Sequence, residues 1–248
     1  DGLQLPQSQV WVNLCPSVLD QRQSALTAQA DCIDFAERLT AKLAQPGHDT
    51  IARVQGFCKS LRQNHRRDFD ENENLHWKVL EVIRDTVPDS VTIVSDMTQI
   101  AYTAVDYLPM NRPNQWLHPT GYGTLGYALP AAIGAALADE SKPVLAIVGD
   151  AGLQYTMQEL TLASELGLKI VILLWNNNAL QQICDDMDNA GIARIGVVQK
   201  NPDFLALAKA CHWAAWAVAD FDCFSSDLER ALNAEGPVLI MLDQDTVE

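Results

Sequence analysis

Two kinds of segment alternate along residues 73–248. Runs that are apolar, or apolar apart from Thr92, lie at 91–94, 144–148, 170–175 and 238–242, and residues 213–218 are a further candidate strand. Strands of this kind are typical of a parallel sheet that is buried on both faces. The stretches between them have helical periodicity, which predicts helices at 75–87, 96–107, 125–138, 154–166, 202–211 and 223–234. The pattern predicts an α/β fold with a doubly wound, mainly parallel sheet and helices on both faces.

The first 72 residues follow a different pattern. Residues 8–14 predict a short strand, and residues 30–43 predict an amphipathic helix. Together they are too small to bury a core of their own. Pro46-Gly47 interrupts the pattern, and residues 53–72 are polar and charged, as in a connecting segment. We therefore expect one main domain at 73–248, a linker at 46–72 and a separate piece at 1–45.

Composition and charge narrow the class of protein. Hydrophobic residues make up 48% of the chain and charged residues 20%, as in an ordinary globular protein. No apolar run approaches the roughly 20 residues that span a bilayer, so we expect no membrane partner. The net charge of −15 argues against a nucleic-acid surface, which would need a basic patch.

The cysteines indicate the cellular location of the protein, and the first residues indicate whether the chain is a piece of a longer one. Six cysteines are scattered without a CxxC pair, which favours reduced thiols in the cytoplasm. There is no signal peptide, and the chain begins Asp1-Gly2 rather than with Met. We therefore expect a cytoplasmic protein and a piece of a longer polypeptide.

Polar side chains close two consecutive apolar strands. Asp150 follows the run at 144–148, and Asn177 follows the run at 170–175, 27 positions later. Since consecutive parallel strands present their carboxyl ends at one edge of the sheet, the two side chains should meet there. Their oxygens suit a Mg²⁺ that also holds phosphate. Taken separately, Gly149–Gly152 is equally a capped turn, and Asn176–Asn178 is a polar turn.

A glycine-rich segment supports a different interpretation. Gly121–Gly126 matches G-x-G-x-x-G, so a nicotinamide-dependent dehydrogenase with a Rossmann site is an alternative. That fingerprint should leave directly from a buried strand, whereas residues 114–119 do not predict one.

The segment 149–177 resembles the diphosphate- and magnesium-binding motif of thiamine-diphosphate-dependent enzymes, which starts Gly-Asp and ends Asn-Asn. Residues 123–135 are similar to the acetolactate synthase and 2-oxo acid decarboxylase group, and the resemblance covers about residues 73–245. It implies thiamine diphosphate and Mg²⁺ as cofactors and a 2-oxo acid as substrate. It also implies that residues 1–45 are the tail of a central Rossmann-like domain. Because family sites form between subunits, a homodimer or homotetramer is expected.

The resemblance also assigns roles to individual residues. Mg²⁺ would be bound by the side chains of Asp150 and Asn177 and by the backbone carbonyl of Ala179. Leu125 would lie beneath the thiazolium, and the carbonyl of Gly123 would accept a hydrogen bond from the aminopyrimidine; a core leucine is the alternative for Leu125. The cofactor contacts implied are Gln99, Gly123, Leu125, Gly149, Asp150, Ala151, Gly152, Leu153, Asn177 and Leu180. The glutamate that activates the cofactor in this family lies on an amino-terminal domain, which no segment here resembles.

Substrate choice depends on the residues that follow the asparagines. Gln182 and Asp186 would face the substrate, one helical turn apart. A carboxylate there suits a guanidinium, and the stretch 177–207 looks most like 5-guanidino-2-oxopentanoate decarboxylases. A solvated helix face is the alternative for Asp185 and Asp186, and His118 is a weaker catalytic candidate. An acetolactate synthase-type carboligase and a non-catalytic fragment remain open as functions.

Overall fold

The computed structural model describes residues 8–20, 26–65 and 69–247. The chain divides into two compact units, residues 1–63 and residues 64–248. Within the described residues, no helix combines the length and the apolar character needed to cross a membrane.

The first unit contains a small parallel sheet of two strands, β1 and β2, with Val10 opposite Leu26. Its elements are β1 (Val10–Asn13), α1 (Pro16–Leu19), β2 (Leu26–Gln29), α2 (Cys32–Lys42) and α3 (His48–His65). The strand and the amphipathic helix predicted at 8–14 and 30–43 are confirmed, whereas β2 is not predicted from the sequence. Residues 48–65 form a helix where the sequence predicts a polar linker, because polarity alone does not distinguish an exposed helix from a loop.

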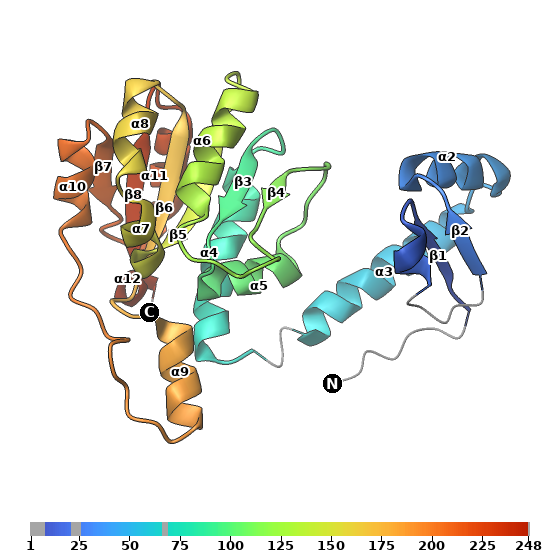
Figure 1. The fold of residues 1–248 in the computed structure, drawn as a ribbon, viewed down its shortest axis with the longest axis horizontal. Helices are drawn as coiled ribbons and strands as arrows, with labels where there is room; N and C mark the ends of the chain where they lie inside the picture. The colour runs from blue at the N-terminus through green and yellow to red at the C-terminus, as the bar shows by residue number, and fades with distance from the viewer. Residues whose placement is uncertain (1–7, 21–25, 66–68, 248) are drawn as a thin grey trace. The chain divides into compact units, whose positions relative to one another are not determined.

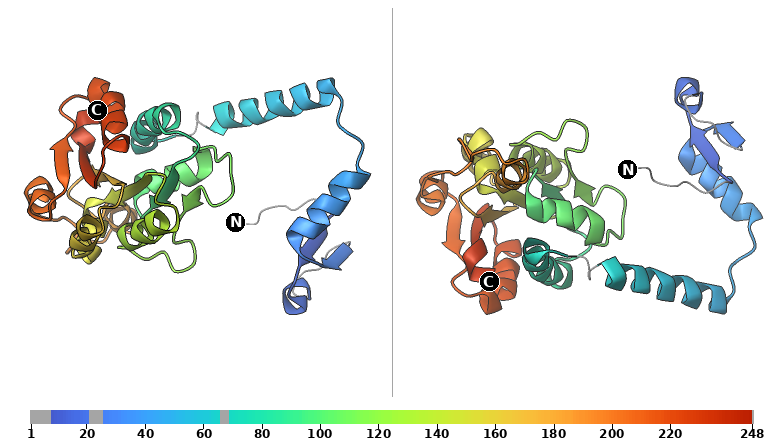
Figure 2. Two further views of the ribbon diagram at one scale, coloured as in Figure 1. Left: turned by 90° about the horizontal axis from the view of Figure 1, so that it is seen from above. Right: turned by 90° about the horizontal axis from the view of Figure 1, so that it is seen from below.

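The second unit is built on a six-stranded sheet in the order β4-β3-β5-β6-β8-β7, and every neighbouring pair is parallel (Figures 1 and 2). Its strands are β3 (Thr92–Ser95), β4 (Trp116–Leu117), β5 (Val144–Gly149), β6 (Ile170–Asn176), β7 (Ala214–Ala217) and β8 (Val238–Asp243). The predicted parallel sheet is confirmed, and so is the candidate strand at 213–218.

Helices cover both faces of this sheet, as predicted (Figure 1). The helices of the unit are α4 (Glu71–Thr86), α5 (Gln99–Tyr107), α6 (Ala128–Ala138), α7 (Asp150–Thr156), α8 (Glu159–Glu165), α9 (Gln181–Asn189), α10 (Phe204–Ala210), α11 (Phe224–Leu232) and α12 (Gln244–Val247), with a 3₁₀ turn at Phe221–Cys223. Alternate residues of each strand enter two separate cores. On β5, Leu145 packs with α4, α5 and α11, whereas Ala146 packs with α6, α8 and α10.

Several boundaries differ from the predicted ones for local reasons. α4 begins at Glu71 rather than at 75, since Asp70 and Glu73 form a capping box there. α6 begins at Ala128 rather than at 125, because Gly126 has a positive φ of 81° that cannot continue a helix. The predicted helix 154–166 is two short helices, α7 and α8, and the first begins at Asp150. Residues 114–119, from which no strand is predicted, contain the two-residue strand β4.

Candidate cofactor and metal site

The site is at the carboxyl ends of β5 and β6, which are adjacent, parallel strands with Gly149 opposite Trp175. α7 starts at Asp150, directly after β5, and Asn177 directly follows β6. The predicted adjacency of these two strand ends is therefore confirmed. This edge is where ligands bind in open α/β sheets.

A cavity of about 200 Å³ opens at this edge. Most of the residues predicted for the site line it: Gln99, Gly123, Leu125, Gly149, Asp150, Ala151, Gly152, Asn177, Ala179, Leu180 and Gln182. Met97, Thr98, Tyr102, Gln181 and Ile183 complete the lining. Residues separated by up to 86 positions in the sequence (183 − 97) therefore share one cavity.

Asp150 is almost completely buried, with 2% of its surface exposed. One carboxylate oxygen accepts a hydrogen bond from the backbone N–H of Ala151 at 2.8 Å, and the other accepts one from the side chain of Asn201 at 2.6 Å. Burial raises the pKa of Asp150, while hydrogen bonds from Asn201 and backbone N–H groups oppose that shift. No basic residue forms an ion pair with Asp150 in the described part of the chain.

Asn201 connects Asp150 to the asparagines that follow β6. Its amide nitrogen lies 2.8 Å from the side-chain oxygen of Asn176 and 3.2 Å from that of Asn178. Its own side-chain oxygen accepts a hydrogen bond from Gln154 at 3.1 Å. The sequence does not predict a site role for Asn201 or Gln154, since neither lies in a strand-end motif.

Gly152 lies against a second buried carboxylate, that of Asp96 at the end of β3. A Cβ added at Gly152 would lie 2.8 Å from Oδ2 of Asp96. That oxygen accepts a hydrogen bond from the N–H of Gly126 at 2.9 Å, just before α6. Burial raises the pKa of Asp96, and backbone N–H groups, including that of Met97, oppose the shift. The carboxylate thus joins three segments that border the cavity.

The loop before α6 brings Gly123 and Leu125 to the cavity. Gly123 has a φ of 62°, in the left-handed region that favours glycine, and a Cβ there would lie 3.1 Å from the end of Met97. Leu125 is half-buried and lines the cavity rather than belonging to the core. Its position is compatible with the role that the family resemblance implies.

Three predicted residues lie outside the cavity lining. Leu153 is fully buried in the core, so its side chain packs and only its backbone is close to the turn at 149–152. Asp186 is exposed and accepts a hydrogen bond from Gln182 at 3.2 Å. Nδ1 of His118 lies 2.7 Å from the hydroxyl of Ser95, and burial lowers its pKa. His118 thus contacts a side-chain hydroxyl and does not line the cavity.

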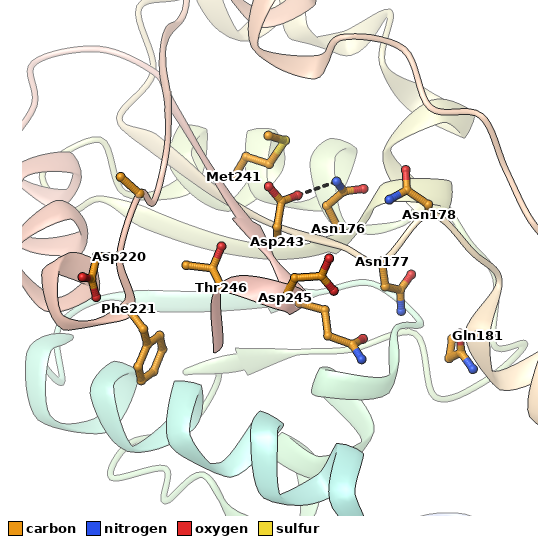
Figure 3. A pocket seen from close by; sticks show the side chains of 12 residues that line it. Asn176, Asn177, Asn178, Gln181, Asp220, Phe221, Met241, Asp243, Asp245 and Thr246 are labelled. Carbon is orange, nitrogen blue, oxygen red and sulfur yellow. Dashed lines mark hydrogen bonds between the residues drawn. The ribbon is translucent and has the colours of Figure 1, made fainter. Parts of the chain in front are cut away.

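A second cavity of about 790 Å³ lies beside the first, at the carboxyl ends of β6, β7 and β8 (Figure 3). Asn177 and Gln181 line both cavities. Three carboxylates line it, those of Asp220, Asp243 and Asp245, and Asp243 accepts a hydrogen bond from Asn176 at 2.6 Å. The asparagine turn therefore lies between the two cavities.

The family model described as "Thiamine pyrophosphate enzyme, C-terminal TPP binding domain" matches residues 96–242. The chain belongs to the thiamine pyrophosphate enzymes. This membership confirms the family that the sequence resembles. It overturns the nicotinamide-dependent alternative built on Gly121–Gly126, a segment of which Gly123 and Leu125 line the cavity.

Relatives within the thiamine pyrophosphate enzymes include decarboxylases and acetolactate synthases. A protein of Pseudomonas aeruginosa named "Probable 2-ketoarginine decarboxylase" is 41% identical over 220 residues, which are 88% of this chain and 39% of that protein. The acetolactate synthase isozyme 1 large subunit of Escherichia coli is 42% identical over 105 residues, or 42% of this chain and 19% of that one. This chain spans about two fifths of the first relative's length.

A solved structure has the same fold. The thiamine diphosphate-dependent 4-hydroxybenzoylformate decarboxylase of Rhodococcus jostii superposes with a TM-score of 0.62 and 26% identity, over 66% of this chain and 31% of that one.

The cavity is compatible with the family's cofactor on structural grounds. Gly149, Ala151 and Gly152 carry a methyl group or no side chain, so a diphosphate can approach the backbone closely. Asp150 is a buried carboxylate without a bonded cation among the described residues, which is costly unless a cation binds there. With Asn177 and the carbonyl of Ala179, it supplies the oxygen donors that Mg²⁺ prefers.

Proposed function

We propose that the chain is the cofactor-binding part of a thiamine-diphosphate-dependent 2-oxo acid decarboxylase. The observation that carries this proposal is the cavity at the ends of β5 and β6, in a chain of this family, with buried Asp150 in its lining. The 41% identity to a protein named as a 2-ketoarginine decarboxylase supports the decarboxylase branch.

We propose that Mg²⁺ is held by the side chains of Asp150 and Asn177 and by the backbone carbonyl of Ala179. The metal would join the diphosphate to the protein, since Mg²⁺ is usually bound by one or two carboxylates together with phosphate oxygens. The hydrogen bond from Asn201 would keep the Asp150 carboxylate in a single orientation.

The other lining residues would bind and orient the cofactor. The turn 149–152 and Gln99 would contact the diphosphate, and Leu125, Leu180 and the carbonyl of Gly123 would contact the rings. The bound cofactor supplies the electron sink that loss of CO₂ from a 2-oxo acid requires. The apolar side chains of Leu125 and Ile183 would exclude water from the reacting carbon.

For the substrate we propose a 2-oxo acid with a guanidino group. In the first turns of α9, Gln182 lines the cavity. The carboxylates of Asp185 and Asp186 follow it and would attract the cationic guanidino group of such a substrate. The second candidate function is an acetolactate synthase-type carboligase, favoured by the 42% identity over residues shared with that enzyme.

We also propose an oligomeric state and a cellular location for the whole protein. We infer a homodimer or homotetramer, because sites of this family form between subunits. We infer a cytoplasmic location, because all six cysteines are free.

Two measurements on the full-length protein test this function. Calorimetry should detect thiamine diphosphate binding that requires Mg²⁺ and is lost in Asp150→Ala; binding that is independent of metal would contradict the proposed site. Incubation with a panel of 2-oxo acids, followed by product identification, should yield an aldehyde from the guanidino acid. Acetolactate formed from pyruvate alone would instead support the carboligase.

A further inference from the structure

α9 carries two glutamine–aspartate pairs, and they differ in what they contact. Gln181 and Asp185 are four residues apart, as are Gln182 and Asp186, so each pair occupies one face of the helix. The Gln182–Asp186 pair is exposed. Asp185, in contrast, is half-buried and accepts a hydrogen bond from Gln99 at 2.8 Å, across 86 positions of sequence.

The Asp185 carboxylate uses both of its oxygens. Oδ2 accepts a hydrogen bond from Nε2 of Gln99, and Oδ1 accepts one from Nε2 of Gln181 at 2.7 Å. No basic side chain forms an ion pair with Asp185 among the residues that the structure describes. Hydrogen bonds to a charged acceptor are about twice as strong as neutral ones. We call these two hydrogen bonds the Asp185 bridge.

Both donors of the Asp185 bridge line the cofactor cavity. Gln99 is the first residue of α5, and Gln181 is the first residue of α9. A carboxamide is planar, so fixing its nitrogen also fixes its oxygen. Each nitrogen keeps a second hydrogen that the bridge does not use. The bridge therefore determines which polar atoms Gln99 and Gln181 present to a ligand.

α9 has few other attachments. Figure 1 shows it standing off the end of the sheet, below the other helices. Its buried residue Cys184 contacts the carbonyl of Val197 at 3.8 Å, and Leu180 donates its N–H to the same carbonyl at 2.9 Å. Those contacts join α9 only to the segment that follows it. Among the described residues, the bond to Gln99 is the one side-chain hydrogen bond that joins α9 to another helix of the unit.

We propose that Asp185 is a positioning residue of the cofactor cavity. It orients Gln99 and Gln181 and keeps α9 docked against the start of α5 as one wall of the cavity. The effect on thiamine diphosphate rests on the proposed function, whereas the docking of α9 does not. Asp186, the carboxylate that the sequence favours, has no such connection.

Hydrogen exchange and calorimetry on the full-length protein test this role. In Asp185→Ala, backbone amides of residues 181–189 should exchange about tenfold faster, since one charge-assisted hydrogen bond to α5 is lost. The Kd for thiamine diphosphate with Mg²⁺ should rise about tenfold for the same reason. Asp188→Asn is the matched control, because Asp188 lies on the same helix but bonds Arg194; its Kd should stay within about twofold of wild type.

Two further variants keep the test decisive. Asp185→Asn retains one acceptor oxygen and should give an intermediate exchange rate, which guards against a folding defect in the alanine variant. Gln99→Leu combined with Asp185→Ala should exchange no faster than Asp185→Ala alone, since the Asp185 substitution already removes the hydrogen bond to Gln99. Wild-type exchange in Asp185→Ala, or binding that is unchanged or tighter, would overturn the proposal. If the wild-type protein does not bind thiamine diphosphate, the proposed function fails and exchange alone decides the role of Asp185.

Discussion

The side-chain nitrogen of Asn201 donates a hydrogen bond to the carboxylate of Asp150 at 2.6 Å, across 51 positions of sequence. The same nitrogen lies 2.8 Å from the side-chain oxygen of Asn176. Asn201 thus joins the end of β5 to the end of β6, the two strands between which Mg²⁺ is proposed to bind. A residue that orients a metal ligand can matter nearly as much as the ligand itself.

Replacing Asn201 with alanine should weaken the Mg²⁺-dependent binding of thiamine diphosphate. Without the amide of Asn201, Oδ2 of Asp150 loses its side-chain hydrogen bond, while Oδ1 keeps the bond from the N–H of Ala151. The carboxylate is then held less firmly in one orientation. Loss of such an orienting contact reduces affinity by about 10- to 100-fold. Calorimetric titration of thiamine diphosphate at fixed Mg²⁺ measures the change.

Asn233→Ala is the matched control for this prediction. Asn233 is exposed at the carboxyl end of α11, and its side chain donates a hydrogen bond to the carbonyl of Glu229. Its affinity for thiamine diphosphate should equal that of the wild type. Equal affinity in Asn201→Ala as well would mean that Asn201 has no part in holding the metal ligand.

The sequence predicts one half of this site and not the other. Asp150 and Asn177 are predictable because apolar strands identify the sheet and a right-handed crossover brings consecutive strand ends together. Asn201 follows Asn177 by 24 positions (201 − 177) and lies in a loop without periodicity. Its contact depends on the path of that loop over the sheet edge, which local pattern does not determine.

The sequence also does not predict which of two neighbouring carboxylates on α9 contacts Gln99. Asp185 lies one helical turn after Gln181, and Asp186 lies one turn after Gln182. Spacing alone therefore cannot select the carboxylate that faces Gln99. The rotation of α9 about its axis is determined by burial of Cys184. That burial depends on the segment around Val197, which folds back over the helix.

Gly152→Ala should destabilise the fold and weaken cofactor binding. The added Cβ would lie 2.8 Å from Oδ2 of Asp96, which is itself held by the N–H of Gly126 and has little room to move. Overpacking of this kind costs about 1–3 kcal/mol. Denaturant unfolding should report that loss, and calorimetry should report a higher Kd for thiamine diphosphate because α7 lines the cavity.

The same glycine-to-alanine substitution at Gly134 should stabilise the fold rather than destabilise it. Gly134 is exposed within α6, and a Cβ there meets nothing within 4 Å. Alanine should therefore raise the free energy of unfolding by about 0.5–1 kcal/mol through its helix propensity. If both alanine variants were stabilised alike, the close approach of Gly152 to Asp96 would not be a constraint on the fold.

His76 should make the stability of the second unit depend on pH. It is 2% exposed, bonds the hydroxyl of Thr103 at 3.0 Å and packs edge-on against Trp175. Burial lowers its pKa from 6.5 to about 4, and the nearby charge of Asp70 opposes this shift only in part. The folded state therefore holds His76 neutral over a range of pH in which the unfolded chain protonates it.

The sign of the effect follows from proton linkage. Between pH 6.5 and about 4 the unfolded chain binds more protons than the folded one, so the free energy of unfolding falls as the pH is lowered through this window. The shift corresponds to roughly 3 kcal/mol when complete. Denaturant unfolding at several pH values between 7 and 4 measures it.

A His76→Gln variant has no titrating group at this position and should lose that part of the pH dependence. Its free energy of unfolding at pH 7 should also be lower, because glutamine fills the space beside Trp175 less well. His48→Gln, at an exposed position of α3, should keep the wild-type slope. A slope between pH 6.5 and 4 that is the same in His76→Gln and in the wild type would assign the acid sensitivity to groups other than His76.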